Sequence, residues 1–447
     1  MFNACCVPRV KPWRENEKLL YVLGNMATDH RASQRLAQVA TGLNAAPAAA
    51  PGSPQRRRSE LSLGRRTGTA AAAALSSGTS GVPRRGVPPR RPRARELGIW
   101  PGGLPTGPHN AITDVPGVLV GQVTLTDEPA GVNTGGTAVL PHGGSLYSDK
   151  VPAAVVVGNG YGKLAGSTQV DELGEIETPI LLTNTLSVGN GMQAVIDFTL
   201  DQPGSEEVRS VNCVVGETND GNLNDIRSHY NLTPTILREA IDTAVSGPVA
   251  EGGVGAGAGT MCYSMKGGIG TSSRRVIVES TVRPSHGVAG SADSADSAEY
   301  TVGVLVQTNF GSLKDLIIMG VPVGAALTEQ GFVPNEALPP ETVVDESPDG
   351  SLMVVLATDA PLGDRQLKRL GLRALMGVAR TNAGTISNGS GDYVVAFSST
   401  ESVRKTPERR SSARTDAATP EVANYNTNAN FVLECSIENA ETIESCP

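Results

Sequence analysis

Short apolar runs, each closed by glycine or a polar residue, recur along the chain from about residue 93 onward. Residues 152–157, 302–306 and 352–356 are rich in valine, leucine and alanine and have the length of strands. Runs of this kind are typical of buried strands. Residues 393–397 form a further apolar run directly after a small, polar segment. The pattern therefore predicts a sheet whose strands are covered by other parts of the protein.

Helical spacing marks two segments between these strands. Thr233 is a favourable N-cap and Pro234 a favourable first helical residue, and residues 236–245 keep helical spacing until Gly247. Residues 362–380 predict a second helix. Its apolar residues lie near a common face: Leu367, Leu370, Leu375 and Val378. This alternation of strands and helices, without a clear internal repeat, predicts one α/β domain with helices covering sheet faces.

The first 92 residues differ from the rest of the chain. Ala-Pro stretches and arginine clusters dominate them, so they cannot bury enough apolar surface to offset the entropy of ordering. We predict a disordered Arg/Ala/Pro-rich extension at 1–92 and a single folded domain at 93–447. The Arg-rich, acid-poor bias is that of an organellar transit peptide, and a nonfunctional extension is the alternative. Two polar inserts, 291–297 and 404–419, are expected to be surface loops.

Composition and charge exclude several function classes. The 52 glycines and 4% aromatic residues favour tightly packed layers with close backbone approaches. The net charge of −8, with the positive charge concentrated in the first hundred residues, argues against a nucleic-acid partner. No apolar run reaches the roughly 18–20 residues that cross a bilayer, so no membrane partner is expected. The six cysteines have no zinc-like spacing and are interpreted as reduced thiols. An intracellular, cytoplasmic protein is expected, unless the extension directs it to an organelle.

The candidate chemistry lies at Ser-Asn-Gly-Ser-Gly-Asp, residues 387–392, directly before the apolar run 393–397. Gly389 lets the backbone bend so that the Ser390 hydroxyl can reach the Gly389 carbonyl. An N-to-O acyl shift and hydrolysis would then release Ser390 with a free α-amine. That amine can act as the base that histidine supplies in a catalytic triad. On this pattern alone an ordinary turn is the alternative, because Asn-Gly and Ser-Gly pairs are common in turns.

Other motifs give less information about the function. The histidines show no triad motif, and there is no Gly-x-Ser-x-Gly elbow. The glycine-rich segment 158–163 follows a predicted strand but lacks the spacing of a phosphate-binding loop. We therefore expect it to line a substrate cleft. Four acidic residues are interpreted as a solvated face, with binding of a substrate ammonium group as the alternative. They are Asp171, Glu172, Glu175 and Glu177.

Ordered sequence blocks from residue 93 almost to the C-terminus point to one family. They include Pro-His-Asn-Ala-Ile-Thr-Asp-Val-Pro-Gly-Val at 108–118, Gly-Glu-Thr-Asn-Asp-Gly at 216–221, Gln-Thr-Asn-Phe-Gly at 307–311 and Asn-Gly-Ser-Gly-Asp at 388–392. Together these blocks resemble the L-aminopeptidase/D-esterase family of the DmpA type, which includes β-peptidyl aminopeptidases. The resemblance implies an α+β fold, a four-layer αββα sandwich shared with the ornithine acetyltransferases.

The resemblance also implies a mode of action. Self-cleavage between Gly389 and Ser390 would give a larger α chain and a small β chain that begins at Ser390. Family members remove N-terminal residues from short peptides, amides or esters and assemble as homo-oligomers of αβ units. No metal or organic cofactor is expected. Ser390 corresponds to the nucleophile. Ser436 and Glu438 match a Ser-x-Glu pair that supports the nucleophile and its α-amine.

Oxyanion stabilisation is also carried over from the family. Tyr263 matches a tyrosine that hydrogen-bonds the oxyanion. A second donor falls near Asp359, where a backbone amide would have to serve because a carboxylate is a poor donor. Asn309 is the reserve candidate.

Two departures from the family leave alternatives open. This chain has the polar insert 404–419, and it stops at 443–447 where a longer apolar helix is expected. A shortened last helix would weaken the position of Glu438, so a catalytically impaired homologue is one alternative. An acyltransferase on the same fold is the other, although a threonine nucleophile is expected there instead of Ser390.

Overall fold

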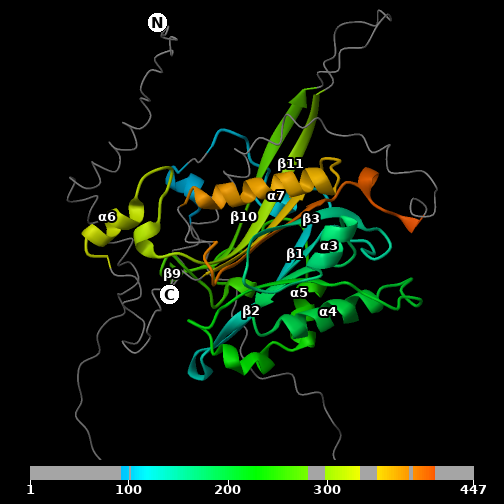
Figure 1. Ribbon diagram of the computed structural model, residues 1–447, viewed down its shortest axis with the longest axis horizontal. Helices are drawn as coiled ribbons and strands as arrows, with labels where there is room; N and C mark the ends of the chain where they lie inside the picture. The colour runs from blue at the N-terminus through cyan, green and yellow to red at the C-terminus, as the bar shows by residue number, and fades with distance from the viewer. Residues whose placement is uncertain (1–91, 100–101, 280–296, 333–349, 382–385, 408–447) are drawn as a thin grey trace, which may run out of the picture. The chain divides into compact units, whose positions relative to one another are not determined.

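The computed structural model describes residues 92–99, 102–279, 297–332, 350–381 and 386–407 (Figure 1). Within these residues, two β-sheets account for most of the strands. The larger sheet has the strand order β10-β11-β12-β13-β3-β5, and the smaller has the order β1-β2-β6-β7-β4. The strands are β1 (Leu119–Asp127), β2 (Val132–Leu140), β3 (Val151–Gly160), β4 (Leu164–Ala165), β5 (Glu175–Ile176), β6 (Ile180–Asn184), β7 (Val214–Thr218), β8 (Met261–Cys262), β9 (Met265–Lys266), β10 (Gly268–Glu279), β11 (Ser297–Asn309), β12 (Ser351–Thr358) and β13 (Gly391–Ser398).

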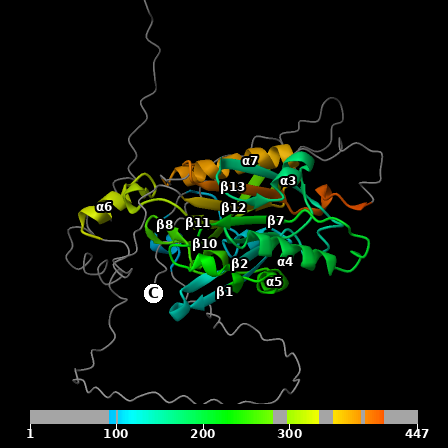
Figure 2. The same ribbon diagram turned by 60° about the horizontal axis from the view of Figure 1, so that its bottom comes forward.

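Helices cover the outer faces of the two sheets. The helix α7 (Asp364–Ala379) packs on the larger sheet, whereas α4 (Val188–Leu200) and α5 (Pro234–Asp242) pack on the smaller one. Figure 2 shows the resulting order, with α7 at the top, the strands in the middle, and α4 and α5 below. The shorter helices are α3 (Ser167–Leu173) and α6 (Val323–Glu329). The predicted αββα sandwich is therefore confirmed.

The central strand β13 shows how the layers are built from sequence. All of its residues are buried. Val394 and Ala396 face the helix α7, whereas Val395 and Phe397 face the second sheet. Successive side chains point to opposite faces of a strand, so a run that is apolar at every position suits a sheet that is covered on both sides.

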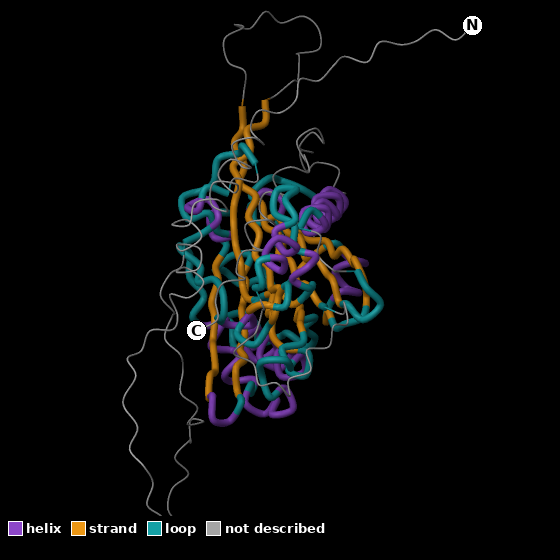
Figure 3. Tube along the Cα trace, turned by 90° about the vertical axis from the view of Figure 1, so that its left-hand side faces the viewer, coloured by secondary structure: helices purple, strands orange, loops and turns teal. Residues whose placement is uncertain are grey.

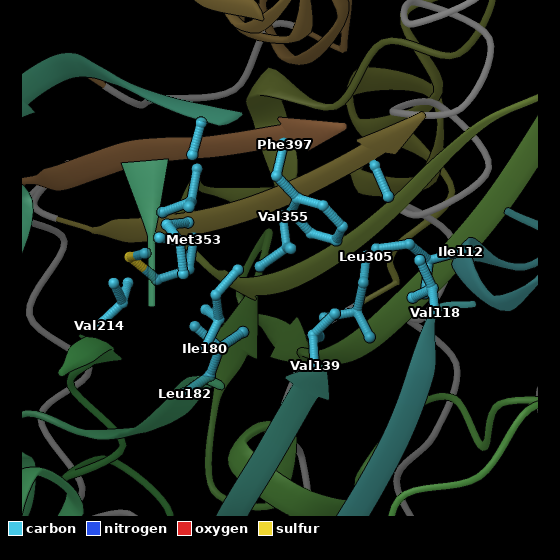
Figure 4. Close-up of a cluster of buried hydrophobic side chains, with 14 of the residues drawn as sticks. Ile112, Val118, Val139, Ile180, Leu182, Val214, Leu305, Met353, Val355 and Phe397 are labelled. Carbon is cyan, nitrogen blue, oxygen red and sulfur yellow. The ribbon is translucent and has the colours of Figure 1, made fainter. Parts of the chain in front are cut away.

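The core between the sheets is made by both of them (Figure 4). Val139 and Leu182 come from the smaller sheet, and Leu305, Val355 and Phe397 come from the larger one. Burying side chains of this size stabilises the fold by about 1.5–3 kcal/mol each. The far ends of β10 and β11 extend beyond the rest of the larger sheet (Figure 3). Among the described residues, none of the helices is both long and apolar enough to cross a bilayer.

The predicted strands are confirmed as β3, β11, β12 and β13, all of them longer than the apolar runs. The Thr233 side chain caps α5 as predicted, since its hydroxyl accepts a hydrogen bond from the Ile236 amide at 3.3 Å. However, α5 ends at Asp242 instead of continuing to Val245. Val245 exchanges backbone hydrogen bonds with Val120, at 2.9 and 3.0 Å, and so adds a bridge to β1.

The interpretation of the acidic residues as a solvated face is wrong for two of the four. Asp171 and Glu172 are exposed, but Glu175 and Glu177 are buried. Glu175 pairs with Lys150 at 3.4 Å and with Lys405 at 3.1 Å, and Glu177 also pairs with Lys150. These buried ion pairs connect segments that are far apart in the chain, so the two glutamates do not belong to a solvated surface.

The predicted loop 404–419 is described only at its start. Arg404 donates to the Ser399 carbonyl oxygen, and the Lys405 amide donates to the Lys150 carbonyl oxygen at 2.8 Å. These first residues are therefore held on the domain. Most of the predicted disordered extension, residues 1–91, and most of the insert 291–297 lie outside the described residues.

Candidate active site

Ser390 stands directly before β13, the strand between β12 and β3 in the larger sheet. It is 0% exposed. Its amide donates to the Ser387 carbonyl oxygen at 3.1 Å, which closes a turn over Ser387–Ser390. Its Oγ has no hydrogen-bond partner among the described residues. A buried, unpartnered hydroxyl is costly, and such groups are characteristic of reactive sites.

The glycine-rich segment 158–163 lies against the candidate nucleophile. The Ser390 carbonyl oxygen accepts hydrogen bonds from Asn159 Nδ2 at 2.6 Å and from the Tyr161 amide at 3.3 Å. The next residue is packed as closely, because a Cβ added to Gly391 would lie 2.9 Å from the Tyr161 carbonyl oxygen and 3.1 Å from Gly162 Cα. Both Ser390 and the start of β13 are therefore fixed by the end of β3.

Glu217 supplies a carboxylate beside this point. It is the fourth residue of β7 in the smaller sheet and is only 4% exposed. Its Oε1 accepts from the Lys163 amide at 3.0 Å. A Cβ added to Gly162 would lie 3.1 Å from this Oε1 and 3.2 Å from Gly391 Cα. The Glu217 carboxylate and the start of β13 therefore flank the same glycine, and the same Oε1 lies 3.5 Å from Lys163 Nζ.

Asn309 lies at the same end of the sheet as Ser390. It is paired with Ser351, and Ser351 is paired with Gly391 on the other side. Two strand spacings, about 10 Å, therefore separate the backbones of Asn309 and Gly391. Asn309 Oδ1 accepts from the Met261 amide at 3.0 Å, and within the described residues its Nδ2 has no such partner. The register therefore places Asn309 in line with Gly391, the residue that follows Ser390.

Asp359 lies at the opposite end, so its predicted place in the oxyanion site is wrong. The strands β12 and β13 run parallel, with Ser351 beside Gly391 and Thr358 beside Ser398. At about 3.3 Å per residue, Asp359 is therefore more than 20 Å from Ser390 along the sheet. Its Oδ1 instead accepts from the Thr301 amide at 2.7 Å, and burial raises the pKa of its carboxyl.

Tyr263 is buried behind the Asn309 segment. Its amide donates to the Phe310 carbonyl oxygen at 2.8 Å, and its ring packs edge-on against the Phe310 ring at 5.5 Å. Its hydroxyl lies 2.9 Å from the Thr381 carbonyl oxygen and 2.6 Å from Thr381 Oγ1. Donation to an oxyanion would require this contact to break. In the described geometry Tyr263 supports the segment that carries Asn309.

The described residues contain no group of three or more His, Cys, Asp or Glu side chains placed to hold a metal ion. The chemistry that the described geometry supports is that of a serine hydroxyl, a nearby carboxylate and amide donors.

Comparison with known proteins adds to this geometry. Residues 110–442 match peptidase family S58. The chain belongs to this family. It is 42% identical over 327 residues to a β-peptidyl aminopeptidase, BapA, of Sphingosinicella microcystinivorans, and the match spans 69% of this chain and 74% of that protein.

Solved structures agree with this assignment to family S58. A protein of Pyrococcus horikoshii superimposes with a TM-score of 0.63 at 39% identity, over 78% of this chain and 89% of that one. The L-aminopeptidase D-Ala-esterase/amidase of Ochrobactrum anthropi superimposes with a TM-score of 0.64 at 34% identity, over 78% of this chain and 90% of that one. It is described as a prototype of the serine aminopeptidases and a variant of the Ntn hydrolase fold. The predicted DmpA-type resemblance is confirmed.

Three residues of the proposed site need separate treatment, because two are not described by the structure and one was not predicted from the sequence. Ser436 and Glu438 lie outside the described residues, so their assigned roles stay predictions. Glu217, in contrast, was not singled out from the sequence. The sequence does contain a signal for it, a glutamate inside the apolar strand Val-Val-Gly-Glu-Thr at 214–218. A charged side chain is rarely buried unless it is paired, so a glutamate in such a strand indicates a specific partner.

Proposed function

We propose that this S58 protein is a self-processing serine aminopeptidase that is cut between Gly389 and Ser390. One observation carries the proposal: the buried, unpartnered hydroxyl of Ser390 lies in a tight turn directly before the central strand. In maturation Ser390 Oγ attacks the Gly389 carbonyl carbon, and the C–N bond breaks, which frees the Ser390 amine and leaves an ester. Hydrolysis of this ester releases the Gly389 carboxylate and the Ser390 hydroxyl. The small chain then begins at its own nucleophile.

In turnover the free α-amine of Ser390 serves as the base. It takes the hydroxyl proton as Oγ attacks the first amide or ester carbonyl of the substrate and returns it to the leaving group. The acyl group is then bound to Ser390 Oγ as an ester, and one water molecule hydrolyses this ester and restores the hydroxyl. The Glu217 carboxylate binds the α-ammonium group of the substrate, so we expect substrates to need a free N-terminus. Asn309 Nδ2 donates to the oxyanion, held in place by the Tyr263 segment. Ser436 and Glu438 support the α-amine.

We further propose short peptides and amino-acid amides or esters as substrates, and a homo-oligomer of αβ units as the assembly. The relatives support this choice, because they include a β-peptidyl aminopeptidase and an L-aminopeptidase D-Ala-esterase/amidase. No metal or organic cofactor takes part in the proposed steps.

The decisive experiment combines a denaturing gel, N-terminal sequencing and a panel of β-alanyl and L-aminoacyl anilides. We expect two fragments, the smaller beginning at Ser390, and release of aniline from substrates with a free amine. Ser390→Ala should stay as one chain near 46.2 kDa and release none. A wild-type chain that stays intact and yet hydrolyses these substrates would refute the proposal. An intact, inactive wild type would support the impaired homologue instead.

A further inference from the structure

Gln307 carries a buried amide between the two sheets that the proposed reaction does not use. It is 0% exposed and lies in β11, two residues before Asn309. Alternate residues of a strand point to the same face, and Leu305, two residues earlier, packs in the core between the sheets. The Gln307 side chain therefore points from the larger sheet toward the smaller one.

The Nε2 group of Gln307 has three acceptors. It donates to the Thr183 carbonyl oxygen at 3.1 Å, to Thr218 Oγ1 at 2.8 Å and to the Ala256 carbonyl oxygen at 3.0 Å. Two of these acceptors are carbonyl oxygens, which can only accept. Turning the amide round would bring its own oxygen against them, so its orientation is fixed.

Two of these contacts lie beside Glu217. Thr218 follows Glu217 in β7, and Thr183 of β6 pairs with Glu217 across the parallel ladder. Gln307 therefore holds both the next residue of the strand and the neighbour in the adjacent strand. The core between the sheets is made of apolar side chains, whose contacts have no preferred direction. Hydrogen bonds do have a direction, so Gln307 fixes where this part of the smaller sheet lies on β11.

The other polar atom of this amide is unfavourably placed. Gln307 Oε1 is buried, and within the described residues it has no hydrogen-bond partner. A buried acceptor without a partner destabilises the folded state. The geometry therefore does not satisfy the whole amide. What it provides is a directed link from β11 to the two strands at Glu217.

The position of Glu217 matters because the proposed site is divided between the sheets. Ser390 precedes β13 of the larger sheet, whereas Glu217 lies in β7 of the smaller one. A carboxylate that binds the substrate ammonium group must lie at a fixed distance from Ser390 Oγ, because that distance decides which carbonyl group reaches the nucleophile. A displacement of about 1 Å can lower a rate about 100-fold.

We propose that Gln307 is a positioning residue that sets the place of Glu217 relative to Ser390 and so determines the preference for substrates with a free amine. This inference rests on the proposed function. Gln307 acts through Thr183 and Thr218, the two neighbours of Glu217, and not by contact with the substrate. Its loss should therefore remove the advantage of a substrate amine and leave the reaction of a substrate without an amine nearly unchanged.

The test uses Gln307→Met in the full chain, with Gln366→Met as the matched control. Gln366 is also a buried glutamine, but it lies in α7 and its Oε1 accepts from the Gly363 amide at 3.0 Å. Each variant is assayed with the phenyl esters of β-alanine and of propionic acid, which differ only in the amine. We expect Gln307→Met to lower kcat/KM by about 10- to 100-fold for the β-alanyl ester and by less than about threefold for the propionyl ester. Gln366→Met should change neither value.

Thr218→Val decides the question if Gln307→Met does not fold. Valine has the shape of threonine but lacks the hydroxyl, so it removes only the 2.8 Å contact beside Glu217. We expect a smaller loss of the same kind, about 3- to 10-fold for the β-alanyl ester. An unchanged ratio of the two kcat/KM values would overturn the inference. An equal fall for both esters would also overturn it, because that result indicates a merely structural role.

Glu217→Gln separates the inference from the proposed function. If Glu217→Gln leaves the ratio for the two esters unchanged, the proposed ammonium site is wrong and the inference fails with it. If Glu217→Gln lowers the ratio but Gln307→Met does not, only the inference fails. In the double variant we expect little loss beyond that of Glu217→Gln alone, because the two residues act as one unit. Losses that multiply would show independent effects and would overturn the inference.

Discussion

Gly391→Ala tests how tightly the site is built around Ser390. A Cβ at this position would lie 2.9 Å from the Tyr161 carbonyl oxygen, 3.1 Å from Gly162 Cα and 3.3 Å from the Tyr161 carbonyl carbon. All three are backbone atoms, so no side chain can rotate away. Either β13 or the turn at Tyr161 must move by several tenths of an ångström. Overpacking of this kind costs about 1–3 kcal/mol of folding free energy.

The effect on chemistry should exceed the effect on stability. Reactive groups need placement within about 0.5 Å, and a displacement of about 1 Å can lower a rate 100-fold. We expect Gly391→Ala to slow self-cleavage by about 10- to 100-fold, measured on a denaturing gel, with a modest fall in the thermal midpoint. Gly189→Ala is the control, because Gly189 lies at the start of α4 with no atom within 4 Å of an added Cβ. Wild-type cleavage and thermal stability in Gly391→Ala would refute the close packing described here.

Three further predictions concern charge and the core. Glu217→Gln should leave self-cleavage intact but lower kcat/KM for substrates with a free amine by about 10- to 150-fold, as expected for a lost hydrogen bond to a charged group. Wild-type activity that is equal on N-acetylated and free-amine substrates would contradict this role. Phe397→Ala, at a position 0% exposed between the sheets, should lower the free energy of unfolding by about 3–5 kcal/mol in a denaturant titration. The third prediction concerns Glu177. Burial alone would raise the pKa of its carboxyl, but Lys150 and Asn212 bring that pKa below the ordinary 4.5. The contribution of Glu177 to the free energy of unfolding should therefore be lost as the pH falls below 4.5, and Glu177→Gln should remove this pH dependence from the stability profile.

The sequence was most informative where local pattern decides the structure. The apolar run at 393–397 predicted β13 because a strand covered on both faces needs apolar residues at every position. The turn at 387–390 was predictable from its glycine and small polar residues. Periodicity also placed α5, but it overran the end of that helix. The pairing of Val245 with Val120 is a tertiary contact that no local spacing reveals.

The errors arose where function depends on partners far apart in the chain. Asp359 follows an apolar strand, but only the parallel register shows that it leaves the sheet at the end opposite to Ser390. Glu177 was interpreted as solvated because its partner, Lys150, is 27 residues away and charge pattern carries no distance information. Glu217 reaches the site from the other sheet. Such contacts follow from the packing of two sheets and are not encoded in any single segment.

The place of β13 in the larger sheet explains why the cut that we propose would leave the fold intact. The scissile bond lies outside the ladders, so its loss removes none of the hydrogen bonds between β13 and its neighbours β12 and β3. The Ser390 carbonyl oxygen stays held by Asn159 and Tyr161 after the bond to Gly389 is broken. At the other end of the strand, the Ser398 hydroxyl donates to the Ala360 carbonyl oxygen at 2.6 Å. The new amine is therefore created at the start of a strand that stays paired with a neighbour on each side.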